Sequence, residues 1–190
     1  MQNKGLIIGV TGGIIAAAVV IALFATGTVT LPGQFSLETI EGERTEQGIV
    51  AVPGTGAITE EGTVLAPSGA PTQNDADPSD PNAPQQSGAI DPETLPSQSI
   101  KLVVSSAGFI PNTFTVKAGS PVTLAVTSGD TQTHVFAFND PELSGVAIGI
   151  GPEETRATSF NAPSEKGTYS FYCNVPGHAA RGEVGTMIVE

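Results

Sequence analysis

Residues 172–187 read YCNVPGHAARGEVGTM and contain the chain's single cysteine, Cys173, and one of its two histidines, His178. An alternating, strand-like run enters this stretch, and a tight Pro-Gly turn lies between the two side chains. A thiolate and an imidazole five positions apart on one loop are suitable donors for a soft or borderline metal ion. The second histidine, His134, lies on another strand-like run and can supply a further nitrogen. The stretch therefore predicts a single metal site around which the domain folds.

Composition limits the classes of function. The chain has 190 residues, of which 39% are hydrophobic, so it can bury a core. Its net charge of −12 is concentrated in residues 31–98, which have eleven acids and one base, whereas residues 99–190 have eight acids and five scattered bases. Such a domain has no basic patch for nucleic acid, so we expect no nucleic-acid partner. One cysteine cannot form an internal disulfide, and its thiol needs another explanation.

The N-terminal residues 1–30 are predicted to anchor the chain in a membrane. Leu6 to Val29 is a run of about 24 uncharged, mostly apolar residues, which is long enough to span a bilayer. The alternative is a cleaved signal peptide, whose apolar region is shorter, about 7 to 15 residues, and ends in a small-residue cleavage site. Lys4 precedes the run, so we expect a cytoplasmic tail and an extracytoplasmic C-terminal domain.

Residues 31–98 are predicted to be an acidic, Pro/Gly-rich linker that is mostly disordered. They hold nine of the fifteen prolines, and no aromatic residue follows Phe35. A segment of this composition buries too little apolar surface to offset the entropy of ordering. Short apolar pieces within residues 38–66 leave local order there open. As a flexible coil the linker would have a reach of roughly 45 Å.

Residues 99–190 show short β-like runs separated by Gly, Pro, Asn and Asp, with no helical period. This pattern predicts an all-β domain, either a β-sandwich or a small barrel. The segment 143–154 is rich in glycine and has no clear period. The predicted strands are Ile100–Val104, Thr113–Lys117, Pro121–Thr127, His134–Phe138, Thr155–Phe160, Thr168–Cys173 and Gly185–Val189.

The C-terminal half resembles the cupredoxins, the small blue copper proteins. The resemblance covers residues 99–190 and lies in three pieces of sequence: FTVKAG at 114–119, HVF at 134–136, and GTYSFYC at 167–173 running into PGH at 176–178. The step of five residues from cysteine to histidine is similar to the ligand loops of azurin and rusticyanin. The resemblance implies a Greek-key β-sandwich that binds one copper ion through His134, Cys173 and His178.

The sequence departs from the family at the fourth, axial ligand. Where the rusticyanin-like spacing places a methionine, this chain has Glu183. A carboxylate is a harder ligand than a thioether, so it favours Cu(II) and makes the donor set acceptable to zinc. The alternative is that Glu183 points into solvent beside Arg181, with the carbonyl of Thr133 completing the site. Met187 lies farther on and is expected to be a core residue of the last strand.

The predicted function is outer-sphere electron transfer rather than catalysis. A multicopper oxidase or copper nitrite reductase needs more histidines than the two present, and the binuclear copper site of oxidase subunit II needs a second cysteine where this chain has Gly177. The expected partners are the membrane and a redox protein such as a cytochrome or a terminal oxidase complex. The alternative from another class is a copper- or zinc-binding assembly or structural subunit of a membrane complex, in which Glu183 has altered redox cycling.

Overall fold

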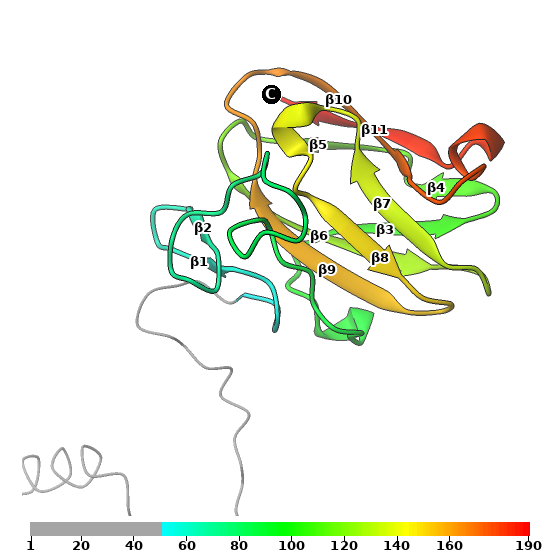
Figure 1. Cartoon of the computed structure of the whole chain (residues 1–190), viewed down its shortest axis with the longest axis horizontal. Coiled ribbons are helices and arrows are strands. Elements are labelled where there is room, and N and C mark those ends of the chain that lie inside the picture. The colour runs from blue at the N-terminus through cyan, green and yellow to red at the C-terminus, as the bar shows by residue number, and fades with distance from the viewer. Residues whose placement is uncertain (1–50) are drawn as a thin grey trace, which may run out of the picture. The chain divides into compact units, whose positions relative to one another are not determined.

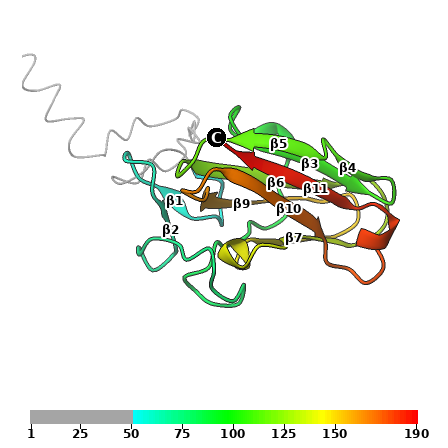
Figure 2. The ribbon, with the colours of Figure 1, turned by 90° about the horizontal axis from the view of Figure 1, so that it is seen from above.

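The computed structural model describes residues 51–190, in which two large β-sheets pack face to face (Figure 1). One sheet has five strands in the order β5 (Thr113–Val116), β11 (Val184–Val189), β10 (Gly167–Cys173), β7 (His134–Phe138) and β8 (Ala147–Ile150). The other has four, in the order β4 (Gly108–Ile110), β3 (Ile100–Ser105), β6 (Pro121–Ser128) and β9 (Thr155–Asn161). The same two layers are seen from above in Figure 2. The predicted all-β sandwich is confirmed for these residues.

The core forms because alternate residues of the strands point between the sheets. Its centre is Phe171 on β10, whose ring lies 5.0 Å from the ring of Phe136 and 5.1 Å from that of Phe109, measured between centroids. Phe171 pairs with Gly185 across the sheet, and a β-carbon at Gly185 would collide with the Phe171 ring. Gly185, the second residue of β11, therefore fixes the register of β11 on β10 just after Glu183.

All seven predicted strands are present, with ends that differ by a residue or so. Two strands of the two large sheets were not predicted. Strand β4 has only three residues, too few to show a period. Strand β8 lies within the glycine-rich segment 143–154 and alternates partly buried Ala147 and Gly149 with buried Ile148 and Ile150. The alternation of exposure along β8 cannot be recognised in the sequence, because its outward-facing residues are alanine and glycine instead of polar residues.

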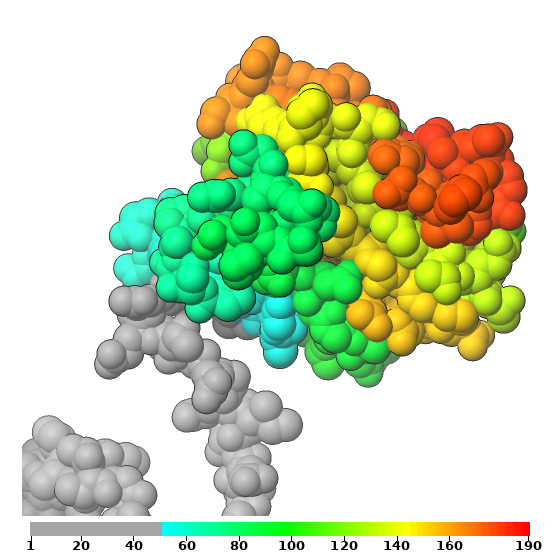
Figure 3. All heavy atoms as spheres, viewed as in Figure 1, coloured from blue at the N-terminus to red at the C-terminus, as the bar shows by residue number. Residues whose placement is uncertain are grey.

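Residues 51–98 correct the prediction of a mostly disordered linker over 31–98, whose first part, 31–50, lies outside the described residues. The segment contains the short strands β1 (Ala57–Ile58) and β2 (Val64–Leu65) and the 3₁₀ turn η1 (Pro92–Thr94). It runs along β9, where the Ser87 amide donates to the Ala157 carbonyl at 2.7 Å and the Ala157 amide donates to Ser87 Oγ at 2.9 Å. Figure 3 shows this segment, cyan to green, lying on one face of the sandwich.

The linker prediction failed because composition describes a segment that stands alone. Here the segment satisfies much of its backbone in its own turns and makes further hydrogen bonds, through backbone and side chains, to the edges of the two sheets. Gln86 Oε1 accepts from the Gly149 amide on β8, and the side chain of Asn161 on β9 bonds to the backbone of Gly62 and Val64. An exposed sheet edge invites pairing with other chains, and this segment covers that edge on both β8 and β9.

Two further 3₁₀ turns, η2 (Pro141–Leu143) and η3 (Ala179–Arg181), lie in loops of the larger sheet. Among residues 51–190, no helix has both the length and the hydropathy that crossing a bilayer requires. The predicted anchor, residues 1–30, lies outside the described residues.

Removing residues 51–98 is expected to destabilise the domain. Val52, Val64, Ala83 and Leu95 are all at most 7% exposed, and burying one such valine or leucine contributes about 1.5–3 kcal/mol. We expect the chain 99–190 to unfold with a free energy lower by about 2 kcal/mol or more than that of 51–190, and to self-associate through its uncovered edge strands. Urea unfolding and size-exclusion chromatography measure the two effects. Equal unfolding midpoints for the two chains would contradict the assignment of 51–98 to the folded domain.

Candidate metal centre

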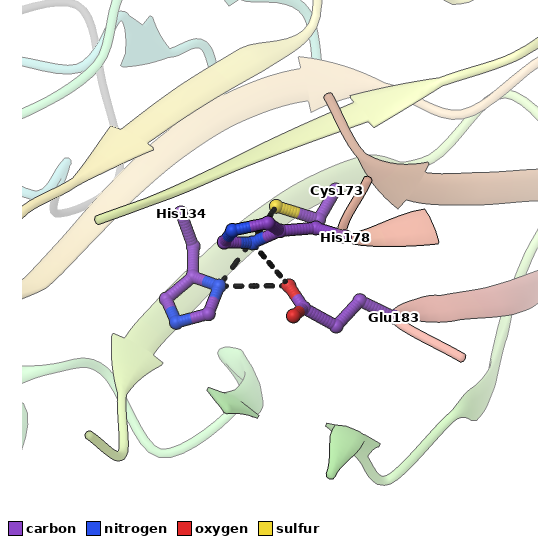
Figure 4. A group of neighbouring side chains, drawn as sticks. All are labelled: His134, Cys173, His178 and Glu183. Carbon is purple, nitrogen blue, oxygen red and sulfur yellow. Dashed lines mark hydrogen bonds and ion pairs between the residues drawn. The ribbon is translucent and has the colours of Figure 1, made fainter. Parts of the chain in front are cut away.

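Four side chains from three parts of the larger sheet meet at one end of the sandwich (Figure 4). His134 is the first residue of β7, Cys173 is the last of β10, His178 precedes η3, and Glu183 precedes β11. One potential ligand atom from each lies within 4.8 Å of those of the other three. All four are buried, with exposed fractions between 0% and 8%. The structure thus brings together every site residue that the sequence predicted.

Backbone hydrogen bonds set the shape of the ligand loop. The Cys173 amide donates to the Glu183 carbonyl at 2.9 Å, which closes the loop between β10 and β11. Within it, the His178 amide donates to the Val175 carbonyl at 3.0 Å, and Gly182, with φ 107°, ends η3 in the left-handed region that favours glycine. Glu183 is therefore held beside Cys173 by the same bonds that start β11.

The donor atoms are close to one another. Nδ1 of His134 lies 2.8 Å and Nδ1 of His178 lies 3.0 Å from the same carboxylate oxygen, Oε2 of Glu183. Sγ of Cys173 lies 3.5 Å from Nδ1 of His178 and 3.8 Å from Nδ1 of His134. Sulfur, two nitrogens and one oxygen thus surround a common point.

Asp130 orients the first histidine. Its Oδ1 lies 3.0 Å from Nε2 of His134, and its carboxylate also accepts the amides of Gln132 and Ser106, each at 2.9 Å. The hydrogen bond from His134 is the main reason that the pKa of Asp130 falls to about 2. An ionised carboxylate only accepts, so Nε2 of His134 has the proton, and in the neutral imidazole Nδ1 then presents a bare lone pair. Asp130 was not among the predicted site residues, although it lies four residues before His134 in a Ser-Gly-Asp turn.

The donor chemistry fits a bound cation. The bare Nδ1 of His134 faces Oε2 of Glu183, and two acceptors 2.8 Å apart need a proton or a metal ion between them. Burial raises the pKa of Glu183, but the hydrogen bonds of its carboxylate, that from Arg181 foremost, bring the pKa below its ordinary value. Burial raises the pKa of Cys173, opposed by the Val135 amide 3.4 Å from its sulfur. A metal cation at this point would stabilise both the thiolate and the carboxylate.

The side chain of Glu183 points into the cluster and not into solvent. Its side chain is fully buried, with Oε2 among the histidines and Oε1 accepting from Nη2 of Arg181 at 2.8 Å. It therefore points both toward the predicted metal position and toward Arg181, and not into solvent. Met187 is also fully buried, pairs with Tyr169 and Phe114 in the sheet and belongs to the main core cluster, as predicted.

A two-sheet sandwich with a buried Cys, His, His and carboxylate cluster at one end has the arrangement expected of a single-site metalloprotein of the blue copper class. The sequence-family model described as a cupredoxin-like domain matches residues 85–189 of this chain. The chain therefore belongs to the cupredoxin family, whose members bind one copper ion and are electron-transfer proteins rather than enzymes.

Individual relatives cover less than half of the chain but most of their own length. Plastocyanin of Mercurialis perennis is 37% identical over 91 residues, which are 43% of this chain and 86% of the relative. Plastocyanin of Cucumis sativus is 35% identical over 94 residues, 44% of this chain and 89% of the relative. The predicted likeness to the azurin and rusticyanin loop stays a prediction from spacing.

Among solved structures, a reduced auracyanin from Roseiflexus castenholzii is 24% identical, with a TM-score of 0.43, and covers 50% of this chain and 98% of its own. An amicyanin from Paracoccus versutus is 20% identical, with a TM-score of 0.41, and covers 54% of this chain and 92% of its own.

Replacing Asp130 is expected to weaken copper binding. Asp130→Asn keeps an oxygen near Nε2 of His134 but removes the charge that fixes the tautomer, so we expect copper affinity to fall about tenfold. Competition with a chelator of known affinity measures this. The matched control is Asp77→Asn, because Asp77 also accepts an amide two residues on, from Ser79 at 2.9 Å, outside the cluster. Equal affinities of the two variants would contradict the role given to Asp130.

Proposed function

We propose that this chain is a membrane-tethered electron carrier whose single copper ion is held by His134, Cys173, His178 and Glu183. The observation that carries the proposal is the buried group of electron-pair donors around one point, with the nearest acceptors 2.8 Å apart. Copper bound there would supply a one-electron couple, since thiolate favours Cu(I) and imidazole nitrogen and carboxylate oxygen accept Cu(II).

The chain's own residues make the site rigid. His134 and Cys173 lie on neighbouring strands, and hydrogen bonds within the ligand loop fix His178 and Glu183. Donors held in this way need to move little when the charge at the site changes. The side chain of His178 is 10% exposed, whereas those of His134 and Glu183 are fully buried. We therefore infer that electrons enter and leave at the edge of His178.

The partners follow from the proposed location. The apolar run Leu6 to Val29 would anchor the chain in a membrane and hold the copper domain on the extracytoplasmic side. A carrier placed there would exchange electrons with a cytochrome or a terminal oxidase complex of the same membrane. With only two histidines, the chain has no further histidine to bind a second, catalytic copper.

The tether has a direct test. We expect the full chain to sediment with membranes and to resist extraction by high salt, because an apolar span is held by the bilayer and not by charge. A chain that begins at residue 31 is the control and should be released. Protease added outside spheroplasts should remove the copper domain of the full chain. Recovery of the full chain in the soluble fraction would contradict the anchor.

A second function rests on the oxygen ligand. With Glu183 in the cluster, the donor set becomes Cys-His-His-Glu, which tetrahedral zinc accepts. Under this alternative the domain binds copper or zinc as an assembly or structural subunit of a membrane complex and has no redox cycle.

Metal loading and visible absorption distinguish the two functions. For an electron carrier we expect the copper-loaded protein to show an intense thiolate-to-Cu(II) absorption that disappears on reduction and returns on oxidation. Glu183→Gln should change both the absorption and the reduction potential, because it replaces a charged ligand by a neutral one. An unaltered spectrum and potential would contradict ligation by Glu183. Colourless protein purified with zinc would contradict electron transfer.

A further inference from the structure

The carboxylate of Glu183 is shared between two groups. Its Oε2 faces the two histidines, while its Oε1 accepts from Nη2 of Arg181 at 2.8 Å (Figure 4 shows the first of these contacts). The same Nη2 donates to Oε1 of Gln132 at 3.2 Å, on the loop that leads into β7. Arg181 thus joins the loop before His134 to the loop after Cys173.

Arg181 also sets the charge near the site. A thiolate from Cys173 and a carboxylate from Glu183 would contribute two negative charges, and Asp130 adds a third through His134. Within residues 51–190, Arg181 is the one lysine or arginine in an ion pair with this cluster. Its side chain is 42% exposed, so solvent screens part of its effect, but its contact with the buried carboxylate is direct.

We infer that Arg181 is a positioning residue that restricts Glu183 to one-oxygen contact with the metal and thereby sets the preference of the site between Cu(I) and the divalent ions Cu(II) and Zn²⁺. This inference rests on the proposed role of Glu183 as a ligand. With Oε1 occupied by the guanidinium, only Oε2 is available to the metal, and the electron density that it donates is reduced.

The ion pair with Arg181 therefore weakens the preference of the Glu183 carboxylate for divalent ions. An unpaired carboxylate would stabilise a divalent ion more than Cu(I), because the attraction grows with the charge on the metal. Arg181 reduces that difference, so that a site with an oxygen ligand keeps a usable affinity for Cu(I). Arg181 therefore determines how far the relative affinities of this site for Cu(I) and divalent ions approach those of a site with a neutral axial ligand.

The test compares Arg181→Gln with wild-type protein in the full chain. We expect the ratio of Cu(II) to Cu(I) affinity to rise by about threefold to tenfold, and tenfold corresponds to a fall in reduction potential of about 59 mV. The ratio of Zn²⁺ to Cu(I) affinity should rise in the same direction. Arg181→Lys should restore most of both ratios, because its ammonium can still donate to Oε1 of Glu183. The matched control is Arg156→Gln, which removes an arginine paired with Glu154 at 3.0 Å, outside the cluster, and should change the ratios less than about twofold.

A double-mutant cycle separates positioning from charge alone. If Arg181 acts through Glu183, Arg181→Gln should have little effect on either ratio in a Glu183→Gln background. A shift of the same size in both backgrounds, or the same shift for Arg156→Gln, would overturn the inference. Wild-type protein that binds no copper would refute the proposed function instead, and Zn²⁺ affinities around the same cycle would then decide the role of Arg181.

Discussion

The hydrogen bond from the Cys173 amide to the Glu183 carbonyl is the constraint on which the metal centre depends. It continues the pairing of β10 with β11 past the last strand pair, Tyr172 with Val184, and closes the intervening residues into one loop. The loop can close only here because Gly185 must lie beneath the Phe171 ring, where a side chain would collide. Packing of the core thus fixes the register of β11 on β10, and this register fixes the conformation of the ligand loop. The loop in turn places Glu183 beside the two histidines. The fourth site residue is a result of sheet geometry as much as of local sequence.

Much of the fold and the cluster could be predicted because their signals are local in sequence. Alternating runs show the strands, and a rare cysteine and two histidines show the centre. What could not be predicted depends on contacts between distant segments. Asp130 gains its role only when β7 turns Nε2 of His134 toward it, and residues 51–98 gain their place from contacts with the distant strands β8 and β9. Composition and local pattern describe a segment in isolation. The role of Asp130 and the order of residues 51–98 both depend on contacts with other segments.

The edges that residues 51–98 cover explain why so polar a segment folds. Its turns satisfy their own hydrogen bonds, and few of its residues enter a core: Val52 and Leu95 form a small cluster with Ala125 and Ala157 on the outer side of the four-stranded sheet. Each contact is modest, but together they cover much of the edge of β9, where Ser87 and Ile90 both donate amides. The copper domain therefore begins before the cupredoxin match at residue 85, and the predicted boundary at 99 is too late.

Burial of Glu183 connects stability to metal binding. A fully buried carboxylate without partners is strongly destabilising, and here one oxygen has Arg181 whereas the other faces two imidazole nitrogens. Because Asp130 fixes the proton of His134 on Nε2, the facing Nδ1 and Oε2 repel unless a cation lies near both. A proton can meet that need, but it satisfies one pair of atoms at a time. A metal ion satisfies sulfur, nitrogen and oxygen together, so metal binding relieves the repulsion that folding creates, and its free energy adds to that of the folded state.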